Sequence, residues 1–288
     1  ADPYALTPEE SQVIDQLTAS FQRSEKLQQH IRFLYSKGGL YKVYNQNLLY
    51  HGCVPLNQDG TLKSVRIYGR AYKGKALYEV LESYVRKGFF ALDKKERERG
   101  KDMMWYIWLH ENSPLFGKDK MATFERYFLA EKETHREKKN PYYELLEDEA
   151  VVNRILREFG LPEEGTHIIN GHVPVKSKAG ESPIKCGGKV LVIDGGFSRA
   201  YQKETGIAGY TLIYNSYGLI LAAHEPFEST EAAIEKESDI HSDSIVVKRT
   251  LARKTVGDTD IGRRLREQIQ DLNELLGAYR SGLIPEKL

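Results

Sequence analysis

Apolar residues near the start of the chain recur at the spacing of one helix face. The residues at this spacing are Val13, Leu17, Phe21, Leu27, Ile31 and Leu34. Thr7 followed by Pro8 is typical of a helix start, because threonine caps free backbone N–H groups and proline suits the first helical position. Gly38 and Gly39 then end the pattern. One long helix is therefore predicted before the first strand.

Three later stretches are continuously apolar instead of alternating. They are "NLLYH" (47–51), "THIIN" (166–170) and "GKVLVIDGG" (188–196). Such short runs predict strands that are covered on both faces. A further extended stretch is predicted at "SVRIYGRAY" (64–72), and residues 210–215 and 219–223 predict a hairpin that turns at Ser216-Tyr217-Gly218.

Helical periodicity dominates the region between these strands. Helices are predicted over 75–90, 120–133 and 141–159, and an amphipathic helix over 261–279 with Asp260 as its cap. The charge run "KKERERGKD" from Lys94 predicts a solvated loop. The order of elements predicts a mixed α/β (α+β) fold, a sheet core interrupted by a helical insertion. Its predicted parts are 1–57 (helix, first core strand and a histidine turn), 58–160 (insertion), 161–227 (C-terminal sheet) and 228–288 (helical extension).

Composition narrows the class of protein. The 288 residues carry 42 basic and 41 acidic side chains, a net charge of +1, which argues against general binding to nucleic acid or to an anionic membrane. No apolar run is long enough to span a bilayer. Cys53 and Cys186 are the only cysteines and have no paired spacing. A disulfide framework or structural zinc site is therefore not expected, and a cytoplasmic location is predicted.

Two predicted strands end in similar histidine turns. "YHGCVP" carries His51 and "NGHVPV" carries His172, each beside a glycine and followed by Val-Pro. A histidine at a strand end is well placed to bind a metal, because the strand fixes its backbone and glycine permits close approach. A core histidine bonded to a backbone carbonyl explains each turn equally well, and both interpretations remain open at this stage.

Longer motifs resemble one enzyme family. "LLYHGCVPL" and "INGHVPV" resemble the histidine turns of calcineurin-like metallophosphoesterases. "NSPLFGKDKMATFERYF", "NGHVPVKSKAGESPIKCGGKVLVIDGGFSRAYQKETGIAGYTLIYNSYGL" and "DTDIGRRLREQIQDL" resemble the class III fructose-1,6-bisphosphatases of bacteria such as the Firmicutes. The resemblance covers nearly the whole chain.

This resemblance implies a fold, an activity and a cofactor. The fold would be part of a metallophosphoesterase β-sandwich flanked by helices, with a helical insertion. The activity would be hydrolysis of the 1-phosphate of fructose 1,6-bisphosphate in gluconeogenesis, with a dinuclear divalent metal site that usually holds Mn²⁺. By correspondence of the turns, His51 and His172 would be metal ligands. The resemblance identifies no catalytic acid or base in this chain.

The superfamily motifs that supply metal-binding carboxylates do not precede His51. They are Asp-x-His, Gly-Asp-x-x-Asp-Arg-Gly and Gly-Asn-His-Asp/Glu, so the chain resembles the C-terminal portion of the family. Asp239-Ile240-His241 and Gly257 to Arg263 only superficially match and are interpreted as a solvated loop and a helix cap. Two divalent ions about 4 Å apart repel by roughly 17 kcal/mol at an effective dielectric of 20, which a bridging carboxylate must offset. The isolated chain is therefore expected to bind metal weakly and not to turn over substrate.

Cationic side chains for the second phosphate of the substrate are predicted in two places. The first holds Lys118, Lys120 and Arg126, and the second holds Lys176, Lys178, Lys185 and Arg199. Ordinary solvated charges remain the alternative for each of them.

Two other functions remain open: a related phosphatase with another substrate, and a non-catalytic half used for assembly or regulation. A sheet without its N-terminal half predicts a bare edge and an uncovered apolar face. The expected partners are therefore an N-terminal portion of the same protein or another copy in a homo-oligomer. Alternatively, the helical block folds back over the sheet and leaves a monomer.

Overall fold

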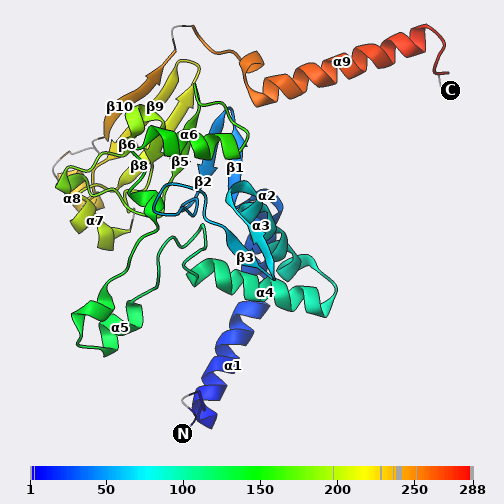
Figure 1. Ribbon diagram of the computed structural model, residues 1–288. Helices are drawn as coiled ribbons and strands as arrows, with labels where there is room; N and C mark the ends of the chain where they lie inside the picture. Colours follow the sequence, from blue (N-terminus) through cyan, green and yellow to red (C-terminus); the bar gives the residue numbers. More distant parts are fainter. Residues whose placement is uncertain are drawn as a thin grey trace.

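The computed structural model describes residue 2 and residues 4–196, 198–227, 229–235, 237, 242–250 and 252–285. Its fold is mixed α/β, as predicted (Figure 1). The helices are α1 (Pro8–Arg23), α2 (Glu25–Lys37), α3 (Gly74–Phe90), α4 (Lys94–Leu109), α5 (Thr123–Phe128), α6 (Glu149–Glu158), α7 (Arg199–Thr205), α8 (Thr230–Glu235) and α9 (Asp260–Arg280). The strands are β1 (Tyr41–Tyr44), β2 (Asn47–Tyr50), β3 (Val65–Ile67), β4 (Arg70–Tyr72), β5 (His167–Asn170), β6 (Ile184–Lys185), β7 (Val190–Val192), β8 (Gly209–Asn215), β9 (Gly218–His224) and β10 (Ser242–Arg249). Among the described helices, none is long and apolar enough to cross a membrane.

The central sheet has the strand order β1-β2-β5-β7-β6. Its middle strands β2, β5 and β7 are parallel, with Leu48 beside Ile168 and Ile168 beside Val190. They coincide with the three predicted apolar runs, although the chain between β2 and β5 contains the whole helical block. Because the carboxyl ends of neighbouring parallel strands meet at one sheet edge, residues far apart in sequence come together there.

Both faces of this sheet are covered. On one face, Leu48, Ile168 and Val190 pack in a core cluster that includes Val152, Ile155 and Leu156 of α6. On the other face, Ile169 and Leu191 pack against Leu219 of β9, which belongs to a second, antiparallel sheet of order β10-β9-β8. The predicted hairpin is thus β8 and β9. The continuous apolar pattern of β5 follows from this double coverage, since all four of its residues are buried.

The prediction that one face of the sheet is uncovered is therefore wrong for the described residues. Helix α6 and Tyr78 of α3, both from the helical block, cover that face. Exposed apolar side chains lie instead on α1, α5 and α9, where Phe21 is 65% exposed and Leu272 is 64% exposed. In Figure 1, α1 and α9 project from the body of the molecule.

Several helix boundaries differ from the prediction because local caps intervene. The first helix is two helices, since Ser24 is extended and its side chain accepts a hydrogen bond from Leu27 N–H to begin α2. The predicted helix 141–159 begins only at Glu149, where the Asp148 carboxylate caps α6. The charge run from Lys94 is not a loop, because the Asp93 side chain caps α4 there. Thr259, not Asp260, caps α9.

The predicted helix 120–133 is also much shorter in the structure. Only the six residues of α5 are α-helical, and a 3₁₀ turn follows over Lys132–His135. The exposed Phe124, Tyr127 and Phe128 leave α5 with no buried face, and the segment is closed by polar contacts instead. A helix of this length gains little from its own backbone bonds.

Helices α3 and α4 pack so closely that glycine is required at their crossing. A side chain at Gly100 would meet the backbone of Gly88 and the carbonyl of Tyr84. We expect Gly100→Ala to lower the free energy of unfolding by about 1–3 kcal/mol, the usual cost of overpacking a close contact. Thermal unfolding followed by circular dichroism measures this loss.

Gly277→Ala is the matched control for this substitution. A side chain at Gly277 in α9 would meet nothing within 4 Å. It should leave stability unchanged or raise it by about 0.5–1 kcal/mol, because alanine favours a helix interior. Equal melting temperatures for the Gly100 variant and the parent would contradict the close crossing.

Candidate functional site

The two histidine turns lie side by side. His51 directly follows β2, and His172 lies just beyond the end of β5, the parallel neighbour of β2. His51 Nε2 and His172 Nδ1 are 3.0 Å apart, although 121 positions separate the residues in sequence. The predicted proximity of the imidazoles, within about 8 Å as a shared metal site requires, is confirmed.

Backbone and amide contacts fix the two turns to each other. Gly171 N–H donates to the His51 carbonyl over 2.9 Å. The Asn170 side-chain amide donates to the Gly52 carbonyl over 3.1 Å. Asn170 is only 2% exposed, and its Oδ1 has no hydrogen-bond partner among the described residues. One acceptor oxygen thus remains open beside the two turns.

Residues 113–117 of the helical block connect the same two turns. The Phe116 carbonyl accepts a hydrogen bond from His172 Nε2 over 2.8 Å. The Pro114 carbonyl accepts one from Cys53 N–H over 2.9 Å. Position 52 must be glycine, because any side chain there would collide with the Pro114 carbonyl. The insertion therefore positions the histidines and does not merely interrupt the sheet.

These contacts determine which nitrogen of His172 is free. Since Nε2 carries the proton that it donates to the Phe116 carbonyl, Nδ1 is unprotonated and accepts a hydrogen bond from His51 Nε2 over 3.0 Å. A ligand histidine that donates its other N–H to a backbone carbonyl is the usual arrangement in metal sites. Two nitrogen ligands of one tetrahedral ion lie about 3.4 Å apart, close to the 3.0 Å between Nε2 of His51 and Nδ1 of His172. The pair thus fits two ligands of a metal ion.

The protonation and backbone of His172 support this arrangement. Burial lowers the pKa of His172, and the neighbouring His51 lowers it further, against opposing effects of the Phe116 hydrogen bond and Asp194. The ring is therefore neutral at pH 7, the form that binds metals. His172 also has φ 70°, a left-handed conformation that is uncommon for a residue with a side chain. Such strained backbones concentrate at functional sites.

One carboxylate lies near the two histidines without completing a metal site. Asp194 follows β7, the third parallel strand, and its carboxylate lies near Gly171. Its Oδ1 accepts a hydrogen bond from Gly196 N–H over 2.9 Å. Across the described residues, no three His, Cys, Asp or Glu side chains converge closely enough to hold a metal. The described residues therefore bring two imidazole nitrogens together without a third group close enough to complete a metal site.

Lysines from both predicted groups come together around a residue that the sequence analysis missed. Lys118 and Lys139 lie opposite each other in an isolated antiparallel bridge. Desolvation lowers the pKa of Lys139, and the charges of Lys176, Lys118 and Lys185 lower it further, while Glu181 opposes them. Lys118 also acts electrostatically on His172. We call Lys118, Lys139, Lys176 and Lys185 the lysine cluster. Lys118 already pairs with Glu137 at 2.9 Å and Lys185 with Glu181 at 3.2 Å, so an anion would be held mainly by Lys139 and Lys176, which form no ion pair among the described residues.

The remaining predicted cations lie outside the lysine cluster. Lys120 donates to the Thr134 carbonyl over 2.6 Å, and Lys178 donates to the Lys203 carbonyl over 2.9 Å. Arg126 pairs with Glu137 at 3.4 Å, and the same carboxylate holds Lys118 at 2.9 Å. The side chain of Arg199 lies outside what the structure describes.

The structure describes one of the two segments that superficially match the superfamily motifs. Residues Val256–Asp258 form a 3₁₀ turn before the Thr259 cap of α9, so the helix-cap interpretation of this region is confirmed. Asp239-Ile240-His241 lies outside the described residues.

A cavity of about 630 Å³ opens beside the histidine pair. His51, His172 and Lys118 line one part of it, and its other walls are mainly apolar. The polar exceptions, Glu82 and Arg86, already pair with each other at 2.6 Å. A phosphate group would therefore lie at the end with the histidines and Lys118, not against the apolar walls.

Comparisons with known proteins agree on one family. The family model for Firmicute fructose-1,6-bisphosphatase matches residues 1–281. The chain is 60% identical over 286 residues to the class 3 fructose-1,6-bisphosphatase of Clostridioides difficile and 58% identical over 287 residues to that of Clostridium novyi. Both matches cover 99% of this chain but 43% of the relative. No solved structure matches the chain. The chain belongs to the Firmicute fructose-1,6-bisphosphatase family.

Proposed function

We propose that the complete protein hydrolyses the 1-phosphate of fructose 1,6-bisphosphate and that this chain supplies part of its site. The observation that carries the proposal is the His51–His172 pair, in which the hydrogen bond from His172 Nε2 to Phe116 leaves Nδ1 of His172 unprotonated. The chain spans only 43% of the relatives that it matches, so the remaining ligands would come from the part of the protein beyond this match. On this proposal the chain is the C-terminal portion of a metallophosphoesterase sandwich.

The proposed cofactor is a pair of divalent ions, with Mn²⁺ as the expected metal. His51 and His172 would hold part of this centre. Mn²⁺ prefers oxygen ligands, so a manganese site needs carboxylates in addition to these two nitrogens. When bound, such ions lower the pKa of a coordinated water and supply the attacking hydroxide. The role of this chain is to hold the two imidazoles in a fixed orientation, with the His172 ring neutral.

The lysine cluster is the proposed site for the phosphate that is not cleaved. It adjoins the histidine pair, because Lys118 acts on His172 and lies opposite Lys139. A sugar bisphosphate would thus place one phosphate at the histidines and the other among Lys139, Lys176 and Lys185. A cytoplasmic location belongs to the same proposal and is supported by the free thiols of Cys53 and Cys186.

The first test compares the 288-residue chain with the complete protein. We expect the chain alone to release no phosphate from fructose 1,6-bisphosphate in the presence of Mn²⁺, because no carboxylate of its described part joins the two histidines. Isothermal titration should show much weaker Mn²⁺ binding than in the complete protein. Mixing the chain with the remaining part of the protein, expressed separately, should restore phosphate release.

The controls are a mock preparation and the His172→Ala chain. Restoration by the parent chain and not by this variant would place the histidine in the assembled site. Phosphate release by the purified chain alone, at the rate of the complete protein, would contradict the proposal.

A further inference from the structure

Residues 117–140 form a lobe that leaves the body beside the histidine pair and returns to the same place. Its two ends are joined, because Asn140 N–H donates a hydrogen bond to the Gly117 carbonyl over 2.9 Å. The next residues inward, Lys118 and Lys139, lie opposite each other in the isolated bridge. We call these residues the α5 lobe, since they carry α5, which Figure 1 shows apart from the sheet.

Both ends of the α5 lobe are attached to the histidine turns. At one end, the preceding residue Phe116 accepts the hydrogen bond from His172. At the other end, the Asn140 side-chain oxygen accepts a hydrogen bond over 3.1 Å from the N–H of Leu56, which follows the first turn. Asn140 is only 7% exposed. Residues at the ends of the lobe therefore keep a fixed place relative to the two imidazoles.

One carboxylate connects the inner parts of the α5 lobe. Glu137 Oε2 accepts a hydrogen bond from Lys118 Nζ over 2.9 Å, and its Oε1 accepts one from Ala122 N–H over 3.0 Å. Arg126 lies 3.4 Å from the same Oε1. The Glu137 side chain is only 14% exposed. Burial raises the pKa of Glu137, but the hydrogen bonds from Lys118 and Ala122 outweigh burial and lower the pKa below its usual value. The carboxylate is therefore charged at neutral pH.

The contact with Glu137 gives the Lys118 ammonium group a fixed place. Lys118 lines the cavity together with His51 and His172. A lysine side chain without a partner samples many rotamers, and ordering it on binding costs conformational entropy. Because an ammonium group has three N–H donors, the contact with Glu137 leaves the others for an anion. The ammonium group is therefore oriented before any phosphate enters the cavity.

We propose that Glu137 is a positioning residue that holds the Lys118 ammonium group toward the phosphate that is cleaved. This inference rests on the proposed function and deepens it, since it assigns Lys118 to the reacting phosphate and leaves Lys139 and Lys176 for the other one. Glu137 acts only through Lys118. A cation fixed in advance beside a transferring phosphoryl group stabilises its charge in the transition state, so the arrangement should raise kcat.

Glu137→Gln in the complete protein tests this role, because it keeps the size of the side chain and removes its charge. It should lower kcat by about threefold to tenfold, with a smaller change in KM. The loss should be the same for fructose 1,6-bisphosphate and fructose 1-phosphate, since both carry the phosphate that is cleaved. Lys118→Met should lower kcat by about tenfold or more, because it removes a hydrogen bond to a charged group. Steady-state phosphate release measures these constants.

The double variant separates positioning from a general loss of structure. If Glu137 acts through Lys118, Glu137→Gln should cause no further loss of kcat in the Lys118→Met background. The same loss in both backgrounds would mean that Glu137 supports the fold of the α5 lobe instead, and it would overturn the proposal. An unchanged kcat in the single Glu137→Gln variant would overturn it as well.

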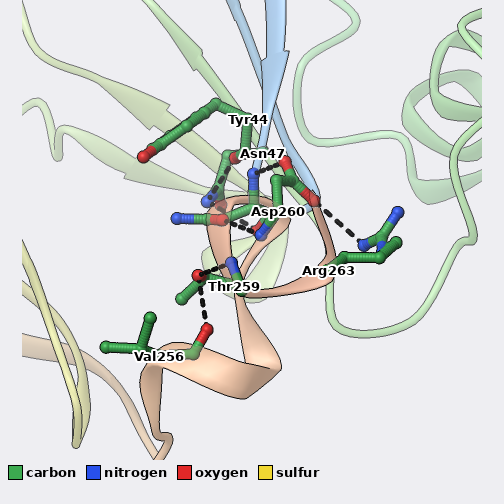
Figure 2. A network of polar contacts seen from close by, with 8 residues as sticks. Tyr44, Asn47, Val256, Thr259, Asp260 and Arg263 are labelled. Carbon is green, nitrogen blue, oxygen red and sulfur yellow. Dashed lines mark hydrogen bonds and ion pairs between the residues drawn. The ribbon is translucent and has the colours of Figure 1, made fainter. Parts of the chain in front are cut away.

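Asp260→Asn is the matched control for Glu137→Gln (Figure 2). The Asp260 carboxylate also accepts a hydrogen bond from a backbone N–H, that of Asn45 over 2.7 Å, and also pairs with a cation, Arg263 at 3.0 Å. Asn45 precedes β2 and His51 follows it, so this network lies at the opposite end of the strand from the histidine pair. The substitution should therefore leave kcat and KM for both substrates unchanged.

The parent protein in the same assay separates this inference from the proposed function. A complete protein that releases no phosphate from fructose 1,6-bisphosphate would overturn the proposed function, and this inference with it. An active parent with an unaffected Glu137→Gln variant would overturn the role of Glu137 alone.

Discussion

His172→Ala in the complete protein should lower the rate of phosphate release from fructose 1,6-bisphosphate by more than about 100-fold. Loss of even an outer partner of a metal ligand costs about 10- to 100-fold in metal affinity or activity, and loss of the ligand itself should cost more. His172 Nδ1 faces His51 Nε2 at 3.0 Å, and its position is fixed by Phe116. Steady-state phosphate release and Mn²⁺ titration on the same preparation measure both consequences.

His224→Ala is a suitable control for this experiment. His224 also ends a strand, β9, but its ring bonds Thr211 at 2.7 Å and Ser242 at 2.8 Å in the antiparallel sheet. We expect its loss to leave both activity and Mn²⁺ binding unchanged. If His172→Ala kept full activity and full Mn²⁺ binding, the pair would be a structural contact and the proposed metal site would be wrong.

The proximity of the two histidines could be predicted because each ends an apolar strand. What the sequence does not contain is the order of the strands. The parallel neighbours β2 and β5 are separated by the entire helical block, and their pairing depends on packing over the whole core. The proximity of the two histidines was predicted because their turns resemble the two histidine turns of one superfamily, which bind metal together.

Other parts of the site have no sequence signal. The acceptor at Phe116 is a backbone carbonyl, which every residue possesses. Lys139 joins the cluster through its pairing with Lys118, a long-range contact that charge spacing does not reveal. Asp194 was visible as a strand-end carboxylate in "KVLVIDGG", and the strand-end argument applied to the histidines could have identified it. Its strand, β7, is the third parallel strand at the same edge.

The predicted helix boundaries were wrong where a capping residue interrupts an apolar pattern. The periodicity of residues 13–34 continues through Ser24, but the Ser24 side chain begins a new helix. Asp148 similarly begins α6 within an apparently continuous stretch. Hydrophobic spacing records which side chains can share a face, whereas a single capping bond decides where the backbone turns.

Lys139→Met in the complete protein should raise KM for fructose 1,6-bisphosphate by about tenfold or more, with little change in kcat. A hydrogen bond to a charged group contributes roughly 1.5–3 kcal/mol, and a contact with a phosphate that does not react stabilises the bound substrate and the transition state equally. Lys139 is the member of the lysine cluster on which Lys118, Lys176 and Lys185 all act. Steady-state kinetics over a range of substrate concentrations separate the two constants.

The substrate itself provides the sharper control. Fructose 1-phosphate keeps the cleaved phosphate and lacks the other, so Lys139→Met should not change its kinetics if the lysine binds the second phosphate. The neighbouring Lys138→Met should leave KM for both substrates unchanged, since Lys138 contacts Asp119 through its backbone N–H and carbonyl and not through its side chain. An equal loss with both substrates would place Lys139 at the reacting phosphate instead. If KM changed with neither substrate, the lysine cluster would be a solvated surface and not a phosphate site. Removing the Lys139 ammonium group would weaken the binding of any phosphate that it contacts.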